Sequence, residues 1–114
     1  MLQRRSPALA GTLRERVTLQ RRAADANGDP LGPWEDQFVS PARVLARTQG
    51  EVVLESRIAG VQPVEVTLRL DRQTALIDTD WRLLFLGWPF GVTAVAVDEL
   101  AAIVTLLAVR SRDQ

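Results

Sequence analysis

The stretch that decides the fold is Val64–Asp71, with the sequence VEVTLRLD. Apolar and polar side chains alternate along it without a break, so that one face carries Val64, Val66, Leu68 and Leu70. A period of two is typical of a β-strand with one face in a core and the other in solvent. The chain therefore contains at least one half-buried strand in its second half.

Similar stretches flank this strand on both sides. Strands are predicted over Leu13–Arg22, Trp34–Arg47, Trp81–Leu86, Phe90–Val97 and Ile103–Arg110. Asp98 could also cap a helix over the last of these stretches, but its β-branched residues favour a strand. In Phe90–Val97, the alternation assigns Val92, Ala94 and Ala96 to one face. Pro41 interrupts the second strand and predicts an edge position or a bulge there.

The connections are marked by strong breakers. Residues 24–33, ADANGDPLGP, contain Asn27-Gly28, which suits a turn, and prolines that should stop any ladder of strand hydrogen bonds. A tight turn is expected at Gly87-Trp88-Pro89. Gln73–Asp80 should be a connection with a short strand around Ala75–Ile77.

Together these elements predict a mostly β protein, a small antiparallel barrel or sandwich of five or six strands. A short helix or a mobile loop is expected near residues 50–60. We expect a flexible arm over residues 1–10, one domain over 11–110 and a frayed tail over 111–114.

The residue types that are missing exclude several kinds of chemistry. The 114 residues include no His, Cys or Tyr, and all fourteen basic residues are Arg. Disulfides, thiolate zinc sites and catalytic triads built on His are therefore impossible. We expect no cofactor, no metal and no enzymatic activity. The longest apolar stretch, Ala101–Val109, is too short to span a membrane, and no secretory signal is visible, so an intracellular, soluble domain is expected.

Charge is balanced overall but unevenly distributed. The first 22 residues are strongly basic, and residues 25–36 carry only acidic charges. The two groups are Arg4, Arg5, Arg14, Arg16, Arg21 and Arg22, and Asp25, Asp29, Glu35 and Asp36. They form either ordinary solvated surface, or complementary patches that meet across subunits, or a basic arm near nucleic acid.

Two further features of the sequence are candidate sites. Asp78 and Asp80 form the one close carboxylate pair in a loop, which is more typical of a turn than of a cation site. Trp34 and Trp88 flank turns and are candidate interface anchors, whereas the other aromatic residues are expected in the core.

Residues 49–60 are different from the rest of the chain. Gly50 and Gly60 bracket a segment in which Val53, Leu54, Arg57 and Ile58 lie at helical spacing. The spacing of Glu51 and Glu55 puts these two carboxylates on one face of the predicted helix. A short amphipathic segment between glycines can move or refold at an interface.

The order of these motifs resembles the phage head–tail joining family, the head-closure or stopper proteins of tailed phages and gene transfer agents. Gly-x-Leu-Arg followed by a strand ending in Gln-Arg, Ala-Arg-Val in the second strand, and a Gly-x-x-Phe-x-Val motif are similar to that family. The matching residues are Gly11, Leu13, Arg14, Arg16, Val17, Leu19, Gln20, Arg21, the turn Asn27-Gly28, Trp34, Ala42, Arg43, Val44, Val64–Arg69, Gly87, Phe90, Val92 and Val95. Pro41 stands where the family often has an aromatic residue.

The resemblance implies a structural protein that forms a homo-oligomeric ring in the neck of the particle. It implies a portal or adaptor protein above, a tail protein below, packaged DNA in the channel without sequence specificity, and no membrane. Such a protein is made in the host cytoplasm. Candidate interface residues are Arg14, Arg16, Arg21, Asp25, Asp29, Trp34, Glu35, Asp36 and Trp88. The matching channel-facing mobile segment is Gln49–Gln62, with Gly50, Glu51, Glu55, Arg57 and Gly60.

Two other functions remain open at this point. A tail-terminator or tail-completion protein would share the size and the β content. A free β-barrel binding module of the host would instead show an exposed aromatic groove and bind its ligand as a monomer.

Overall fold

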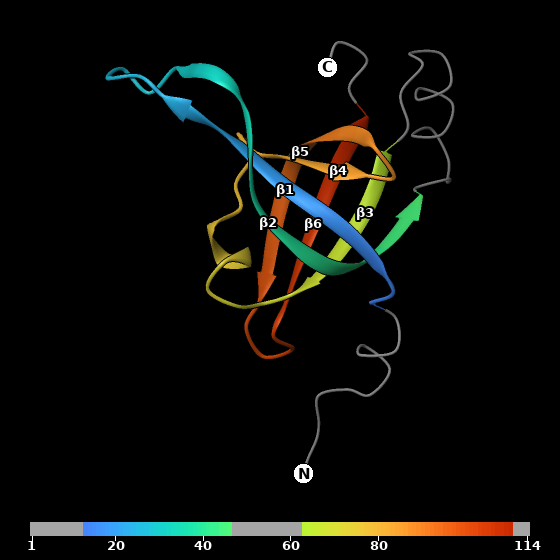
Figure 1. Ribbon diagram of the computed structural model, residues 1–114. Coiled ribbons are helices and arrows are strands. Elements are labelled where there is room, and N and C mark those ends of the chain that lie inside the picture. Colours follow the sequence, from blue (N-terminus) through green and yellow to red (C-terminus); the bar gives the residue numbers. More distant parts are fainter. Residues whose placement is uncertain (1–12, 47–62, 111–114) are drawn as a thin grey trace.

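In a computed structural model, described over residues 13–46 and 63–110, six antiparallel strands close into a barrel (Figure 1). The strands are β1 (Glu15–Ala24), β2 (Pro30–Ala46), β3 (Pro63–Arg69), β4 (Arg82–Phe85), β5 (Trp88–Asp98) and β6 (Ile103–Arg110), with a 3-10 helix η1 (Thr74–Leu76). Their order around the ring is β1-β2-β3-β6-β5-β4, and β4 pairs again with β1. The predicted fold class is confirmed, as a closed barrel.

The core lies inside this ring. Val66, Leu68 and Leu106 are fully buried, and the alternation predicted for Val64–Asp71 places its apolar face inward. The remaining buried apolar residues come from every strand and from Ile77 and Trp81: Val17, Leu19, Ala42, Val64, Leu83, Phe90, Val92, Val104 and Ala108. Burying this surface is the main source of stability in a domain of this size.

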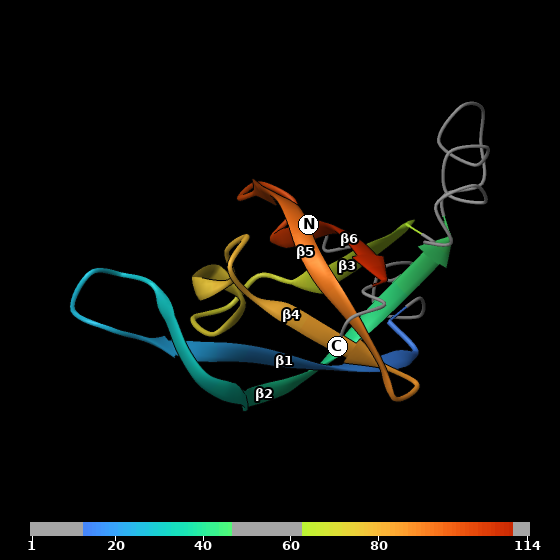
Figure 2. The same ribbon diagram turned by 90° about the horizontal axis from the view of Figure 1, so that it is seen from above.

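The β1–β2 hairpin extends beyond the barrel and forms an arm (Figure 2). Its turn is built by Asp25, whose Oδ1 accepts hydrogen bonds from the backbone N–H groups of Asn27 (2.8 Å) and Asp29 (2.9 Å). Gly28 has a φ of 87°, which glycine adopts without strain. The turn predicted at Asn27-Gly28 is confirmed.

The prediction that Pro30, Gly32 and Pro33 end the ladder was wrong. β2 begins at Pro30, which lies opposite Ala24, and the pairing continues through a register shift between Arg22 and Ala23. Gly32, with a φ of 83°, and Pro33 lie within this irregularity. Proline is tolerated at the start of a strand and in bulges, because no ladder hydrogen bond is required from it there.

Pro41 agrees with its prediction. β2 pairs with β1 through this position, and its pairing with β3 begins only at Ala42. Pro41 therefore lies just outside the β2–β3 pairing, where no ladder hydrogen bond to β3 is required from it.

Three smaller predictions also need correction. Ala75–Ile77 is not a strand, because the Thr74 hydroxyl accepts from the Asp71 N–H and donates to the Arg69 carbonyl, both at 2.8 Å, and so folds the segment into η1. The β4–β5 turn is Leu86-Gly87 rather than Gly87-Trp88-Pro89, since Trp88 already pairs with Phe85. A bulge at Thr93 reverses the alternation in β5, so Val95 packs on the core.

The helix alternative for the last element was wrong. Ile103–Arg110 is strand β6, with the bounds that the sequence predicted. Asp98 Oδ1 does accept the backbone N–H of Ala101 at 3.0 Å, but it stabilises the β5–β6 turn. The expected arm over residues 1–10, the tail and the segment over 49–62 all lie outside the described residues.

Candidate functional site: an arginine–tryptophan cluster at the root of the hairpin

A polar cluster crosses three strands where the hairpin leaves the barrel. Gln20 of β1 lies opposite Asp36 of β2 and Arg82 of β4. Its Nε2 donates to Asp36 Oδ1 and its Oε1 accepts from Arg82 Nε, both at 2.6 Å. Gln20 is only 7% exposed, so both bonds are needed to satisfy its amide. The Gln20 side chain therefore ties β2 to β4 across β1.

Trp34 completes this cluster. The centre of its ring lies 4.7 Å from the guanidinium carbon of Arg82 and 5.8 Å from that of Arg22. Arg22 of β1 and Trp34 of β2 are opposite each other in the β1–β2 pairing. Arg22 Nε also donates to the Gly32 carbonyl at 2.7 Å. Arginine stacks on tryptophan because the cation is attracted to the face of the ring. We call Gln20, Arg22, Trp34, Asp36 and Arg82 the hairpin-root cluster.

Partial burial affects the pKa of Arg82. Desolvation lowers the pKa of its guanidinium below the ordinary value of an arginine. An arginine remains protonated at neutral pH even so. The cluster therefore carries two positive charges, on Arg22 and Arg82, next to one indole ring.

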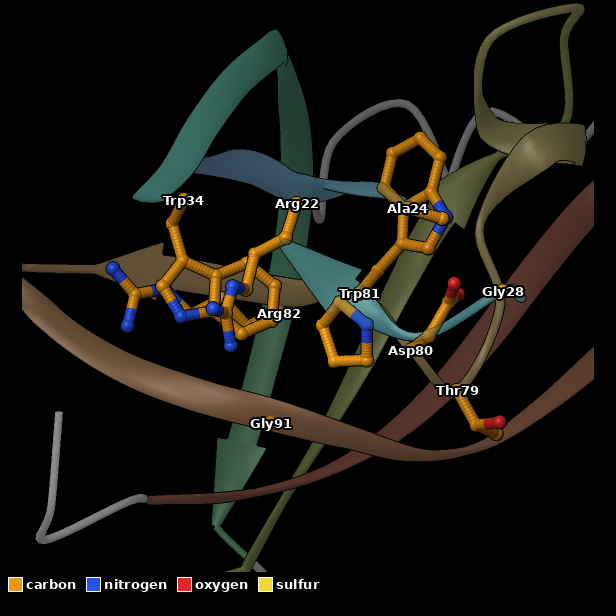
Figure 3. A pocket seen from close by; sticks show the side chains of 10 residues that line it. Arg22, Ala24, Gly28, Trp34, Thr79, Asp80, Trp81, Arg82 and Gly91 are labelled. Carbon is orange, nitrogen blue, oxygen red and sulfur yellow. The ribbon is translucent and has the colours of Figure 1, made fainter. Parts of the chain in front are cut away.

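A pocket of about 330 Å³ opens beside this cluster (Figure 3). Arg22, Trp34 and Arg82 form one side of it, and Asp80 and Thr79 lie toward the other. Trp81 and residues of the hairpin contribute apolar surface. The other lining residues are Ala24, Gly28, Pro30 and Gly91. Concave, mostly apolar sites with a few convergent charged groups are typical of binding sites.

A second arginine–tryptophan contact lies away from the pocket. The guanidinium carbon of Arg110 is 3.6 Å from the Trp88 ring centre, and Trp88 is 52% exposed. Leu86, 78% exposed, neighbours it in the β4–β5 turn. This surface fits the sequence prediction that Trp88 anchors a contact, which stays a prediction.

Apart from Trp88, the predicted interface residues within the described chain lie in three places. Arg14 and Arg16 are exposed near the start of β1. Asp25 and Asp29 lie in the hairpin turn at the other end of β1, and Asp25 has the structural role described above. Trp34 and Asp36 belong to the hairpin-root cluster, while Arg21 and Glu35 are exposed cross-strand neighbours beside it. Gly50, Glu51, Glu55, Arg57 and Gly60 lie outside the described residues.

Gln20, Arg22 and Arg82 were not selected from the sequence as site residues. The sequence places one arginine next to a tryptophan, Arg82 directly after Trp81. Arg22 meets Trp34 only through the pairing of β1 with β2. Their convergence depends on the strand register, which the sequence did not reveal.

The carboxylate pair Asp78 and Asp80 is part of a turn, as expected. Asp78 Oδ1 accepts the Thr79 N–H at 2.8 Å, and its carbonyl accepts the Trp81 N–H at 3.1 Å. Across residues 13–46 and 63–110, no three potential metal-ligating side chains gather. In the same residues, no helix is long and apolar enough to cross a membrane.

The comparison with known families decides the identity. The model of the phage head completion protein family matches residues 8–111. This chain belongs to the phage head completion protein family. The resemblance to phage head–tail joining proteins drawn from its motifs is therefore confirmed.

Two solved structures share the fold of this head completion family member. A solution structure of a protein from Shigella flexneri 2a is 19% identical, with a TM-score of 0.61, covering 91% of this chain and 97% of that one. A chain from the virion of a native gene transfer agent particle is 19% identical, with a TM-score of 0.55, covering 84% of this chain and 93% of that one. No curated protein matches the chain.

Proposed function

We propose that this protein is a structural component of the virion neck that joins the head to the tail. It closes the DNA-filled head below the portal or adaptor protein and provides the platform to which the tail attaches. The observation that carries the proposal is the family match over residues 8–111, which spans the whole barrel and the hairpin arm. The protein works by binding other subunits and not as an enzyme.

The distribution of surface features supports a role in assembly. Arg14 and Arg16 lie at one end of β1, and the acidic turn with Asp25 and Asp29 lies at the other. At a rise of about 3.3 Å per residue, this strand places the two patches roughly 30 Å apart. Two different patches on one chain are what a head-to-tail contact in a ring requires.

The partners follow from this position in the particle. The protein forms a homo-oligomeric ring between a portal or adaptor protein and a tail protein, after synthesis in the host cytoplasm. Packaged DNA lies in the channel and is contacted without sequence specificity. The channel-facing role of Gln49–Gln62 stays a prediction.

Fractionation of particles tests the position. Heads and tails are separated by sedimentation from a producer whose assembly is blocked at head–tail joining, and the protein is detected in each fraction. We expect it with DNA-filled heads. Detection with free tails instead would favour a tail-terminator or tail-completion protein, and detection in neither fraction would contradict a virion role.

A further inference from the structure

The β5–β6 turn presents an unusual pair of side chains. Leu100 is 102% exposed, the most exposed of the large apolar residues in the described chain, and the neighbouring Glu99 is also exposed. The turn is held in place, because Asp98 Oδ1 accepts the Ala101 N–H at 3.0 Å and the Ala102 carbonyl accepts the Leu70 N–H at 2.9 Å. A fixed turn thus displays one carboxylate beside one apolar side chain. We call Glu99 and Leu100 the turn knob.

The pocket at the hairpin-root cluster presents two guanidinium groups beside apolar surface. Arg22 and Arg82 each use Nε within the chain, to Gly32 and to Gln20. Within the described residues, no hydrogen bond or ion pair engages their terminal amino groups. Trp34, Ala24 and Pro30 present apolar surface to the same pocket, which the buried Trp81 also lines. Guanidinium groups oriented through Nε are well placed to bind a carboxylate, and an indole face accepts an aliphatic side chain.

We propose that the turn knob of one copy docks into the hairpin-root pocket of a neighbouring copy. Glu99 faces the guanidinium groups of Arg22 and Arg82, and Leu100 packs against Trp34 and the hairpin residues Ala24 and Pro30. This inference deepens the proposed function, since it names a contact that would build the ring.

The positions of knob and pocket fit a contact between copies. In both ribbon views the β5–β6 turn and the hairpin arm lie on different parts of the molecule (Figures 1 and 2). A knob and a pocket at different places form a heterologous contact, which closes into a ring when the rotation between copies permits it. One side chain pair buries less than the area of a standard stable interface, so an isolated contact should be weak and repetition around a ring should strengthen it.

Duplex DNA is a less suitable occupant of this pocket. A phosphate backbone presents a convex cylinder, whereas the site is concave. The chain as a whole has zero net charge, and dedicated nucleic-acid surfaces are usually basic. DNA therefore serves as an alternative outcome of the test.

The test measures self-association of the full chain. Two-dimensional NMR follows the Trp34 indole N–H and the Glu99 and Leu100 amides while the concentration rises from about 20 μM to about 1 mM, a range that detects weak contacts. Sedimentation velocity follows the mass. Leu100→Arg removes the knob and Arg22→Glu reverses the pocket. Leu76→Arg and Arg43→Glu make the same chemical changes at exposed residues elsewhere and serve as matched controls.

We expect the knob and pocket signals of the wild type to shift together with concentration. Each test variant alone should lose at least tenfold in association, the controls should keep it, and an equimolar mixture of Leu100→Arg with Arg22→Glu should associate. That mixture leaves one intact knob and one intact pocket, so recovery requires this particular contact.

Three results would overturn the proposal. One is a wild-type chain whose signals do not move and whose mass stays monomeric at about 1 mM. Another is association that all variants retain, which would place the contact elsewhere and leave the neck function intact. The third is a shift of the Trp34 signal with a duplex oligonucleotide but not with protein concentration, which would assign the pocket to DNA.

Discussion

The guanidinium carbon of Arg82 lies 4.7 Å from the centre of the Trp34 ring, although β4 and β2 do not pair with each other. Gln20 in the intervening strand β1 holds Arg82 in place and binds Asp36 beside Trp34. The root of the hairpin arm is thereby fixed to the barrel by side chains in addition to backbone pairing. This connection sets the direction in which the arm leaves the body.

Removal of the indole should weaken this connection. Trp34→Ala should lower the free energy of unfolding by about 1–2 kcal/mol, because two cation–π contacts and their packing are lost. Trp34→Phe should lower the free energy of unfolding by less than half as much as Trp34→Ala. Urea denaturation measures both, and equal losses in the two variants would show that the ring contributes nothing through its contacts with arginine.

The buried amide of Gln20 should contribute more to the free energy of unfolding than an exposed amide does. Gln20→Ala leaves Asp36 and Arg82 without their partner and should cost about 1–3 kcal/mol. Gln37→Ala is the matched control, because Gln37 is exposed and donates only to the Glu35 carbonyl; its effect should stay within about 0.5 kcal/mol. Identical urea midpoints for the two variants would contradict the role given to Gln20.

The hydroxyl of Thr74 should be required to fold the connection after β3. Thr74 is 1% exposed and bonds to the Asp71 N–H and the Arg69 carbonyl. Thr74→Val keeps the shape but leaves both groups unpaired, and it should cost about 1–3 kcal/mol. Thr79→Val, at an exposed position, should be nearly neutral in the same thermal denaturation, and a similar drop in Tm for both would argue against this role.

Truncation of a leucine should lower the free energy of unfolding in the core but not in the turn knob. Leu106→Ala empties a fully buried position and should cost about 2–5 kcal/mol. Leu100→Ala changes a fully exposed side chain and should stay within about 0.5 kcal/mol. If Leu100→Ala unfolded the protein, Leu100 would belong to the structure of the monomer and not to a contact between copies.

Replacement of the strained residue in the β4–β5 turn should raise the free energy of unfolding. Leu86 has a φ of 54°, in the left-handed region that costs most L-residues energy, and Gly87 follows it with a φ of 83°. Leu86→Asn creates the Asn-Gly pair preferred in two-residue hairpins and should raise the free energy of unfolding by about 1 kcal/mol. No gain in the urea midpoint would show that the leucine is not strained.

The strands with regular alternation could be predicted from the sequence. The structure has strands β3 and β6 where they were predicted, over Val64–Asp71 and Ile103–Arg110. An alternation with a period of two indicates directly which face of a strand is buried. The irregularities could not be predicted. The bulge at Thr93 moves Val95 onto the core in place of Ala94, and such a shift depends on the partner strand β6.

The candidate site was predicted only in part, for the same reason. The sequence predicted Trp34 and Asp36 as interface residues. Gln20, Arg22 and Arg82 lie beside them only because β1 pairs with both β2 and β4 in a particular register. The register of β1 against β2 also contains shifts that no local pattern reveals. A composition without histidine, cysteine or lysine favours a role in binding, and the interface role of Trp34 stays a prediction.

The central claim is that this protein closes the filled head and joins it to the tail. Electron microscopy of particles from a producer that lacks the gene, together with an assay of the DNA content of the heads, tests it most directly. We predict separate tails beside tailless heads that fill with DNA and then lose it, with normal particles restored by the wild-type gene. Normal tailed particles that retain their DNA without the gene would contradict the claim.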